Sequence, residues 1–419
     1  LPSQEIITNQ AGDKIRETIS YYDNLPFGAA SIGNKTKDAN WMVGVQYANN
    51  SRIYDSFGLI VKSYDANNNP TTNVYDGYNL YPAAVTNALG QKVQYQYDYA
   101  VGKPKQTIDA NNYIYETSFD PIGRVKQERM PDAAAPASLA VSTEYFYTDN
   151  ANPRVAQTKK YLDGANAVDS YAYVNGLDKT IQERTEAENG FSVKDFVYNK
   201  LGLVQSETLA YFLVGSAQTA PTTNNNLYVN YTYDALKRVK TITNAVGATV
   251  NNYSNWKVST TDAKGNAKDY YNDAFGRLIQ VAEKIANPAP ENFNTYYQYD
   301  GNNNLTKITD ALGNVRNFGY DGLGRRISAQ DLHAPGDAAF GIWNYTYDNN
   351  GNLIGQTDPK NQKIAYNYDS LNRKISEDSA NQAGVEATYT YDNGCANGIG
   401  RLCGVKNSSV NTSYDYNAL

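Results

Sequence analysis

The side chains best suited to chemistry in this 419-residue sequence are one histidine, His333, and two cysteines, Cys395 and Cys403. A Ser-His-Asp or Cys-His arrangement would need the imidazole beside a nucleophile and an orienting acid. Neither cysteine is close to His333 in sequence, and the segment DLHAPGD around it is typical of an exposed insertion. Three residues of these types are also too few for a zinc site with four His or Cys ligands. We therefore predict no catalytic residue, no metal site and no cofactor.

The two cysteines lie eight positions apart in a glycine-rich segment. This spacing permits a local disulfide in an oxidising compartment. Two free thiols are the alternative, and the sequence leaves both open.

Two turns rich in Asp and Asn could mimic calcium-binding loops. The segment DANNNP from Asp65 has acidic or amide side chains at positions 1, 3 and 5. However, Pro70 stands where an EF-hand loop needs glycine, and Leu305 stands there in the loop from Asp300. Both stretches are better interpreted as structural turns.

Most aspartates belong to a repeat. Asp55, Asp76, Asp98 and Asp120 each follow an aromatic residue, at steps of 21, 22 and 22 residues. From Asp273 onward the corresponding steps are 27, 21, 27, 21 and 23. Self-similarity of this kind is the signature of a repeat architecture. Any single aspartate is therefore structural by default.

Each Tyr-Asp (YD) unit predicts a strand, a turn and a second strand. Tyrosines alternate with other residues before the pair, as at Tyr95 and Tyr97, which places both rings on one face of a sheet. The Asp opens a turn by bonding the backbone two residues on, and a Gly or Asn supplies the positive φ that ends it. A second turn follows, as in TDALGN or TDPKNQ. The sequence thus predicts an all-β fold of antiparallel hairpins stacked into one continuous, curved or spiralling sheet.

We expect residues 1–50 to be an irregular, YD-like segment and residues 51–419 to be the repeat array, cut off within a repeat at its end. Insertions are expected near residues 132–142, 212–226, 284–294 and 331–342, which are rich in Ala, Pro, Asn or Gly. The residues predicted to form the repeat motif are Tyr54, Asp55, Gly58, Tyr75, Asp76, Tyr97, Asp98, Phe119, Asp120, Gly123, Tyr233, Asp234, Asp273, Gly276, Tyr299, Asp300, Tyr320, Asp321, Gly324, Tyr347, Asp348, Gly351, Tyr368, Asp369, Tyr391 and Asp392.

Composition excludes several classes of function. The 38 tyrosines outnumber the 37 Lys and Arg residues, and the net charge is −6 without a basic cluster. Nucleic-acid binding is therefore not expected, since phosphate recognition needs clustered positive charge. No apolar stretch approaches the roughly 20 residues of a membrane span. The chain lacks an initiator Met, which leads us to expect a fragment or a processed chain.

The pattern Y-D-x-x-G-R-L, with T-D-x-x-G-N between units, resembles the Rhs/YD-repeat family. The segments YDNGCANGIGRLCGV from Tyr391 and YDALKRVKTITNAVG from Tyr233 are similar to that family's consensus, and the resemblance covers about residues 50 to 419. The family includes bacterial Rhs polymorphic toxins, the B and C components of insecticidal toxin complexes, and teneurins. The resemblance implies part of a hollow shell that encloses a C-terminal toxic domain.

The family's shells end in an aspartyl self-cleavage motif, and FDPIGR from Phe119 superficially resembles it. This segment lies inside the array, where Pro121 fits the second position of a type I turn, so a repeat turn is the better interpretation. We expect any true cleavage site beyond Leu419.

The sequence is compatible with three candidate functions to different degrees. The first is a non-catalytic scaffold of a secreted bacterial protein, whose partners are the remaining repeats and an effector domain of its own chain. The second is a cell-surface adhesin or extracellular fibre, in which exposed tyrosine rings could stack on glycans or contact a receptor. The third, an enzyme, has no supporting set of residues.

Overall fold

The computed structural model describes residues 1, 3–133, 135–285, 291–380 and 384–417. Within these ranges the chain forms 35 β-strands and one short 3-10 helix, η1 (Asn225–Leu227). The strand pairs are antiparallel, and most strands that follow one another in sequence are neighbours in the sheet. The prediction of an all-β fold built from antiparallel hairpins is confirmed.

Contacts divide the chain into two compact units. Unit 1 combines Leu1–Ile114 with Tyr296–Leu419, and unit 2 is Tyr115–Thr295. The first segment of unit 1 holds β1 (Gln4–Thr8), β2 (Lys14–Tyr22), β3 (Lys35–Val43), β4 (Gln46–Tyr54), β5 (Ile60–Tyr64), β6 (Pro70–Tyr75), β7 (Pro82–Thr86), β8 (Lys92–Asp98) and β9 (Lys103–Ile108). The second segment holds β26 (Leu305–Thr309), β27 (Val315–Tyr320), β28 (Arg326–Gln330), β29 (Ile342–Tyr347), β30 (Leu353–Thr357), β31 (Lys363–Tyr368), β32 (Lys374–Ser379), β33 (Ala387–Tyr391), β34 (Leu402–Asn407) and β35 (Asn411–Ser413).

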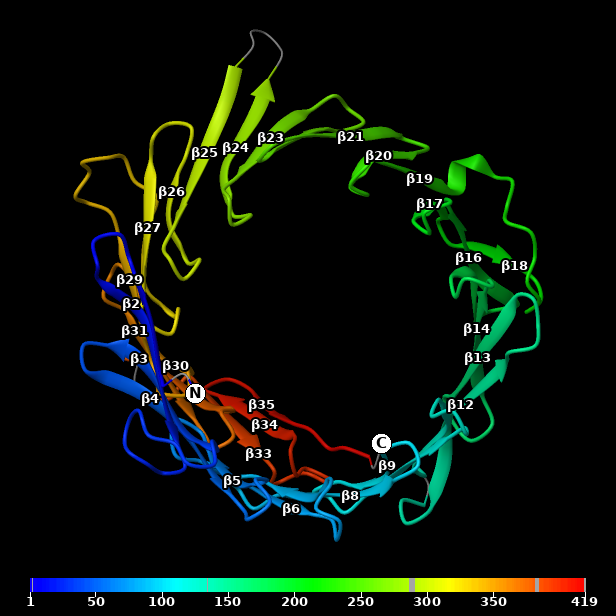
Figure 1. The fold of residues 1–419 in the computed structure, drawn as a ribbon, viewed down its shortest axis with the longest axis horizontal. Helices are drawn as coiled ribbons and strands as arrows, with labels where there is room; N and C mark the ends of the chain where they lie inside the picture. Colours follow the sequence, from blue (N-terminus) through cyan, green and yellow to red (C-terminus); the bar gives the residue numbers. More distant parts are fainter. Residues whose placement is uncertain (2, 134, 286–290, 381–383, 418–419) are drawn as a thin grey trace. The chain divides into compact units, whose positions relative to one another are not determined.

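Unit 2 is one run of strands that Figure 1 shows in cyan, green and yellow-green. Its strands are β11 (Val125–Pro131), β12 (Leu139–Thr148), β13 (Arg154–Tyr161), β14 (Ala167–Val174), β15 (Thr180–Ala187), β16 (Gly190–Tyr198), β17 (Val204–Thr208), β18 (Tyr211–Leu213), β19 (Tyr228–Tyr233), β20 (Val239–Asn244), β21 (Gly247–Ser254), β22 (Lys257–Thr261), β23 (Ala267–Asn272) and β24 (Leu278–Ile285). The strands β10 (Ile114–Phe119) and β25 (Glu291–Tyr299) cross the unit boundaries.

The predicted insertions have different outcomes. The one near residue 212 contributes β18, which pairs with the first half of β16 while β17 pairs with its second half. The insertion near residue 132 runs into β12, and the one near residue 331 makes a bridge between His333 and Val315. In the insertion at 284–294, residues 286–290 lie outside the described residues, and the rest extend β24 and β25.

The turns share one geometry. After β4, the Asp55 N–H donates to the Leu59 carbonyl, and the Gly58 N–H donates to the Asp55 carbonyl. Gly58 has a φ of 81°, so the loop is a type I turn followed by a left-handed residue. The residues with positive φ at the same turn position are Asn68, Asn79, Gly90, Asn112, Gly123, Asp178, Gly202, Lys237, Gly265, Gly276, Asn303, Gly313, Gly324, Gly351, Asn361 and Asn372. Because turns alternate along the strip, the Tyr-Asp turns form one edge (the YD edge) and the others form the opposite one (the second-turn edge).

Replacing Gly324 by valine is expected to destabilise its turn by about 1 kcal/mol or more, because a β-branched side chain is strained at a φ of 76°. The added Cβ would also lie 3.2 Å from the Asn304 side-chain oxygen. Thermal melting and limited proteolysis of the variant should both show the loss.

Lys237 allows the reverse substitution, in which a glycine is introduced, because this lysine occupies the left-handed position of its turn with a φ of 63°. The Lys237→Gly variant should gain about 1 kcal/mol by relieving that strain. Unchanged melting of both variants would contradict the turn assignment.

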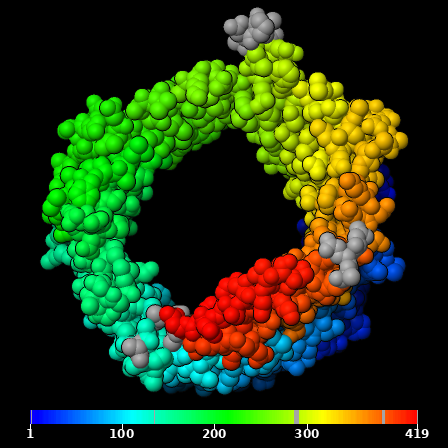
Figure 2. Space-filling view, turned by 180° about the vertical axis from the view of Figure 1, so that it is seen from behind, coloured from blue at the N-terminus to red at the C-terminus, as the bar shows by residue number. Residues whose placement is uncertain are grey.

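Unit 1 has two layers, formed by its two segments. The blue and orange-to-red strands of these segments run together in Figure 1, and their surfaces meet in Figure 2. Each layer is one sheet thick, and among the described residues the buried apolar side chains are few and mostly alanine. In unit 1 these side chains are Ala39, Met42, Ala48, Ala66, Ala84, Ala329, Ala387 and Cys403, and in unit 2 they are Tyr173, Val193 and Ala282. Hydrogen bonds and half-buried rings must therefore carry much of the stability.

Candidate functional site

The carboxylate of the Tyr-Asp pair closes its own turn. Asp369 Oδ1 accepts from the backbone N–H of Leu371 at 2.9 Å and of Arg373 at 3.0 Å. Its Oδ2 accepts from Arg373 Nε at 2.7 Å. The same three bonds form at Asp120, Asp234, Asp273 and Asp321, and an Asn side chain replaces the Arg at Asp300 and Asp348. The turn thus supplies its own hydrogen-bond partners.

The arginine of the turn also reaches the next repeat. Arg373 donates to both oxygens of Asp392, at 3.0 and 2.5 Å, and its guanidinium lies 4.4 Å from the centre of the Tyr391 ring. The hydrogen bonds from Arg373 are the main cause of the lowered pKa of Asp392. Equivalent stacking occurs for Arg124 on Tyr147, Arg238 on Tyr253, Arg325 on Tyr347 and Arg401 on Tyr416. Planar bidentate pairing combined with ring stacking is particular to arginine.

The tyrosine hydroxyl completes this repeat junction. Tyr368 donates to the Leu353 carbonyl at 2.9 Å, just after the preceding YD turn. Hydroxyls that bond a carbonyl of an earlier strand in the same way are those of Tyr54, Tyr75, Tyr97, Tyr147, Tyr198, Tyr233, Tyr253, Tyr347 and Tyr416. Where a repeat has both the arginine and the tyrosine hydroxyl, Asp, Arg and Tyr together fasten it to its neighbour.

Several predicted motif residues depart from this pattern. Phe119 has no hydroxyl, and Asn272 stands where other units have an aromatic residue. The turn of Asp98 places Gly102, rather than the preceding residue, in the left-handed region. The motif arginine was missed as a functional position, although its recurrence four residues after Asp was a readable signal.

The two layers of unit 1 meet along one line, which we call the layer seam. The YD edge of the second layer lies against the second-turn edge of the first. Seam hydrogen bonds join Asn302 to Ile15 at 2.9 Å, Gly322 to Met42 at 2.8 Å, Asn67 to Asp348 at 2.9 Å, Asn350 to Asp65 at 2.6 Å and Ile399 to Asn111 at 3.0 Å. The partners advance together along both layers, so the repeats are in register across the seam.

Close approach at the seam requires glycine at position 322. A Cβ on Gly322 would lie 2.5 Å from the Trp41 carbonyl oxygen and 2.2 Å from its ring. No rearrangement of a flexible side chain could relieve the backbone contact.

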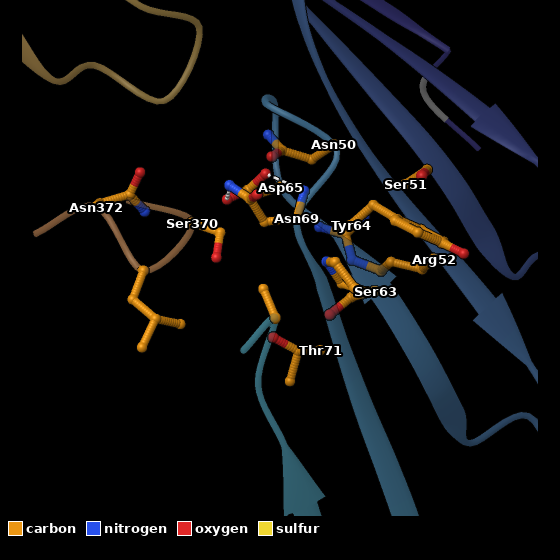
Figure 3. Close-up of a pocket in the computed structure, with 13 residues that line it drawn as sticks. Asn50, Ser51, Arg52, Ser63, Tyr64, Asp65, Asn69, Thr71, Ser370 and Asn372 are labelled. Carbon is orange, nitrogen blue, oxygen red and sulfur yellow. Dashed lines mark hydrogen bonds between the residues drawn. The ribbon is translucent and has the colours of Figure 1, made fainter. Parts of the chain in front are cut away.

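A cavity of about 410 Å³ opens at the seam, between the β4–β6 strands and the turn at residues 370–372 (Figure 3). Its lining includes the hydroxyl and amide side chains of Asn50, Ser63, Thr71 and Ser370. Arg52 is the positively charged side chain in the lining, and it donates a hydrogen bond to Asp38 at 2.9 Å. This lining offers hydrogen bonds to a polar ligand but has no nucleophile paired with a base.

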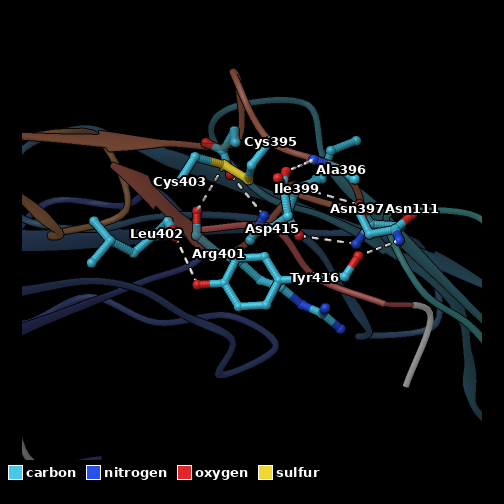
Figure 4. Close-up of a disulfide and its surroundings, with 12 residues drawn as sticks. Asn111, Cys395, Ala396, Asn397, Ile399, Arg401, Leu402, Cys403, Asp415 and Tyr416 are labelled. Atoms are coloured by element: carbon cyan, nitrogen blue, oxygen red, sulfur yellow. Dashed lines mark hydrogen bonds between the residues drawn. A yellow bond between two sulfur atoms is a disulfide. The ribbon is translucent and has the colours of Figure 1, made fainter. Parts of the chain in front are cut away.

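Cys395 and Cys403 are joined by a disulfide, with their Cα atoms 5.3 Å apart (Figure 4). The bond closes the enlarged turn between β33 and β34. Cys403 is 3% exposed, and the residue Cys395 is half-buried.

A buried polar cluster lies beneath the insertion of unit 2. Arg184 and Asp195 are 1% and 0% exposed, and Gln182 bridges them with hydrogen bonds of 3.0 and 2.6 Å. Arg184 also donates to the Gly215 carbonyl at 2.6 Å and to Thr219 at 2.8 Å. These bonds hold the insertion on the sheet.

The residues singled out for chemistry are occupied by structural contacts. His333 stacks on Phe340 with 3.8 Å between ring centres, and its Nδ1 lies 2.8 Å from the Asp331 carbonyl oxygen. In the Asp-Pro turn, the Asp120 carboxylate accepts from Arg124. In the calcium-like loop, Asp65 Oδ1 accepts from two backbone N–H groups. The described part of the chain contains no cluster of three or more His, Cys, Asp or Glu side chains that could hold a metal ion. Nor does it contain a helix with the length and apolar character needed to cross a membrane.

Acid should weaken unit 1 through two carboxylates. Hydrogen bonds from Lys14 and Tyr47 lower the pKa of Glu17 to about 2, and backbone N–H donors, Gly33 first, lower that of Asp23 to about 2. Each of these carboxyl groups has a lower pKa in the folded protein than in the unfolded chain, so its ionised form stabilises the fold. This stabilisation is fully present when the pH is above the ordinary pKa, and it is lost as the pH falls through the folded-state pKa. We expect a constant Tm from about pH 7 to 5 and a decline between about pH 4.5 and 2. Circular-dichroism melts should show a shallower decline for Glu17→Gln, and an identical decline would contradict the assignment.

The fold and its junctions define a class: a repeat scaffold in which Tyr-Asp hairpins are fastened in series. The RHS repeat family model matches residues 299–333 and 347–383, and both matches begin at the tyrosine of a YD pair. These two stretches are therefore similar to RHS repeats, in agreement with the Rhs/YD resemblance of their sequence.

Solved structures share the fold. The crystal structure of TcdB2-TccC3-Cdc42 is 11% identical, covers 96% of this chain and 28% of that chain, and has a TM-score of 0.78. A crystal structure of TcdB2-TccC3 without the hypervariable C-terminal region is 12% identical over 96% of this chain and 28% of that one, with a TM-score of 0.78. The Tc holotoxin pore of Photorhabdus luminescens with a mutated TccC3 is 12% identical over 97% and 28%, with a TM-score of 0.77. The chain therefore spans little more than a quarter of these proteins. No curated protein sequence matches it.

Proposed function

We propose that this chain is a non-catalytic scaffold segment in the shell of a bacterial toxin complex that is secreted or displayed at the cell surface. Its partners are further repeats and a C-terminal effector domain of the same protein, which the shell encloses or presents. Residues 51–419 are the repeat array in this proposal, and residues 1–50 are its less regular beginning.

The layer seam of unit 1 carries the proposal. Walls made from a strip of hairpins need one layer to rest on another, and here the YD turns of four repeats in the second layer do so with hydrogen bonds. The likeness in fold to TcdB2-TccC3 over nearly the whole chain supports the same role.

Limited proteolysis of the full-length protein tests this function. The segment after the repeats should resist trypsin in the wild type and become sensitive when the seam is weakened by Asn67→Ala together with Asn350→Ala. The matched control is Asn230→Ala with Asn344→Ala, two exposed asparagines on strands. Equal digestion in the wild type and the seam variant, or a protein that ends shortly after Leu419, would contradict the proposal.

A glycan-binding surface fibre is the second candidate, and one observation favours it. Tyr78 and Tyr99 are 72% and 50% exposed on the YD edge, with ring centres 5.2 Å apart. Exposed rings can stack on sugar faces. A glycan array should then give signals that Tyr78→Ala and Tyr99→Ala remove, and an array without signal would exclude this candidate.

A further inference from the structure

The disulfide lies in a YD turn that has been enlarged. In an ordinary turn of this edge, the Asp369 N–H donates to the Arg373 carbonyl at 3.0 Å. In the enlarged turn, the Asp392 N–H reaches the Arg401 carbonyl at 3.1 Å, so five more residues lie between donor and acceptor. Asp392 itself is left-handed here, with a φ of 68°, and the disulfide encloses residues 396–402, which include residues 396–400 of the turn.

The enclosed residues make the contacts across the seam at this end of unit 1. Asn111 and Ile399 exchange two hydrogen bonds, both of 3.0 Å. The Tyr113 hydroxyl donates to the Asn397 side-chain oxygen. All four residues are in unit 1, but they are separated by more than 280 positions in the sequence.

The same ring also holds the segment that follows β35. The Ala396 N–H donates to Asp415 at 2.9 Å, and Asn397 Nδ2 donates to the Tyr416 carbonyl at 2.7 Å. Figure 4 shows these contacts around the two sulfurs. Three segments therefore meet at one small ring: the first layer, the second layer and residues 414–417.

The ring is built tightly around its sulfur atoms. A Cβ on Gly398 would lie 2.5 Å from Cys395 Sγ and 2.6 Å from Cys403 Sγ. The ring therefore packs directly on the disulfide, and opening the bond would release the positions of residues 396–399. The other seam contacts come from turns that contain no cysteine.

We propose that the Cys395–Cys403 disulfide is a redox-operated clasp that fastens the second layer and residues 414–417 to the first layer. Reduction requires a dithiol or two thiols of the reducing compartment. A thiolate attacks Sγ of Cys395, the less buried of the two residues, and Cys403 leaves as a thiolate that takes up a proton. A second thiolate then releases Cys395 as a thiol, and the reductant becomes a disulfide. Two electrons and two protons enter the protein, and no backbone bond is broken.

Hydrogen exchange of the full-length protein tests the clasp, because three backbone amides report on the seam directly. Ile399 N–H donates to Asn111, Gly322 N–H to Met42 and Asn67 N–H to Asn350. Reduction should accelerate exchange at Ile399 roughly tenfold or more while Gly322 and Asn67 keep their rates. The amides of Ala396 and Tyr416 should accelerate together with Ile399.

Two variants keep the result interpretable. Cys395→Ser with Cys403→Ser should exchange rapidly at Ile399 without reductant and should not respond to it. Asn111→Ala should accelerate Ile399 in the oxidised protein but add nothing after reduction. The clasp is overturned if mass spectrometry shows the disulfide reduced while Ile399 is unchanged. It is equally overturned if Gly322 and Asn67 accelerate as much as Ile399, since reduction would then loosen the whole unit.

Discussion

Replacing Arg184 by alanine is expected to release the insertion of unit 2 from its sheet, at a cost of about 3–5 kcal/mol in local stability. Arg184 is 1% exposed, and its guanidinium donates to Gln182, Thr219 and the Gly215 carbonyl. Without it, three acceptors lose their donor, and water cannot readily replace it while the insertion stays in place. Asp195, which is 0% exposed, would also lose the neighbouring positive charge.

Proteolysis of residues 214–222 and hydrogen exchange of β15 and β16 would measure this release. The matched control is Arg154→Ala, another arginine of unit 2, whose ion pair with Asp178 at 2.7 Å is exposed. An exposed pair of this kind contributes about 1 kcal/mol or less. Similar effects of the two substitutions would mean that the buried cluster does not hold the insertion.

Replacing Arg373 by alanine is expected to cost about 2–3 kcal/mol in the second layer of unit 1. The side chain pairs with Asp369 and Asp392 and stacks on Tyr391, so one substitution removes the connection between two repeats. Hydrogen exchange should rise in β31 to β34. Since each repeat is stabilised mainly by its neighbours, the rise should decline with distance from the substituted turn.

Arg373→Lys separates charge from geometry. Lysine keeps the positive charge but cannot form the planar bidentate pair or the same stack, so most of the loss should persist. Arg129→Ala serves as a control, because its contact with Glu116 is 3.5 Å long and more exposed. Full recovery with lysine would show that the junction depends on charge alone.

The sequence was sufficient for the hairpins because their determinants are local. Asp369 and Asn372 define a turn within four residues, and the alternation before Tyr368 defines the adjoining strand. The Arg at the end of the motif was not predicted to be functional, because its role depends on Asp392 in the next repeat. The sheet brings this arginine next to Asp392, and the sequence of a single motif does not predict that contact.

Other features depend on contacts between distant segments. Asn67 and Asn350 look like ordinary turn residues, and their contact arises only when the second layer reaches the first. Nothing local distinguishes Arg184 from other strand arginines until the insertion folds over it. The eight-residue spacing of Cys395 and Cys403 left bonded and free thiols equally open, and Asn111 gave no signal of its contact with that ring.

The scarcity of buried apolar side chains has a thermodynamic consequence. Exposure of apolar surface raises the heat capacity on unfolding, whereas exposure of polar surface lowers it. A wall one sheet thick, fastened by carboxylates, amides and hydroxyls, should therefore have a small heat-capacity increment for its length. Its free energy of unfolding would vary little across ambient temperatures. Cooling would lower that free energy less than it does in a protein with a large hydrophobic core.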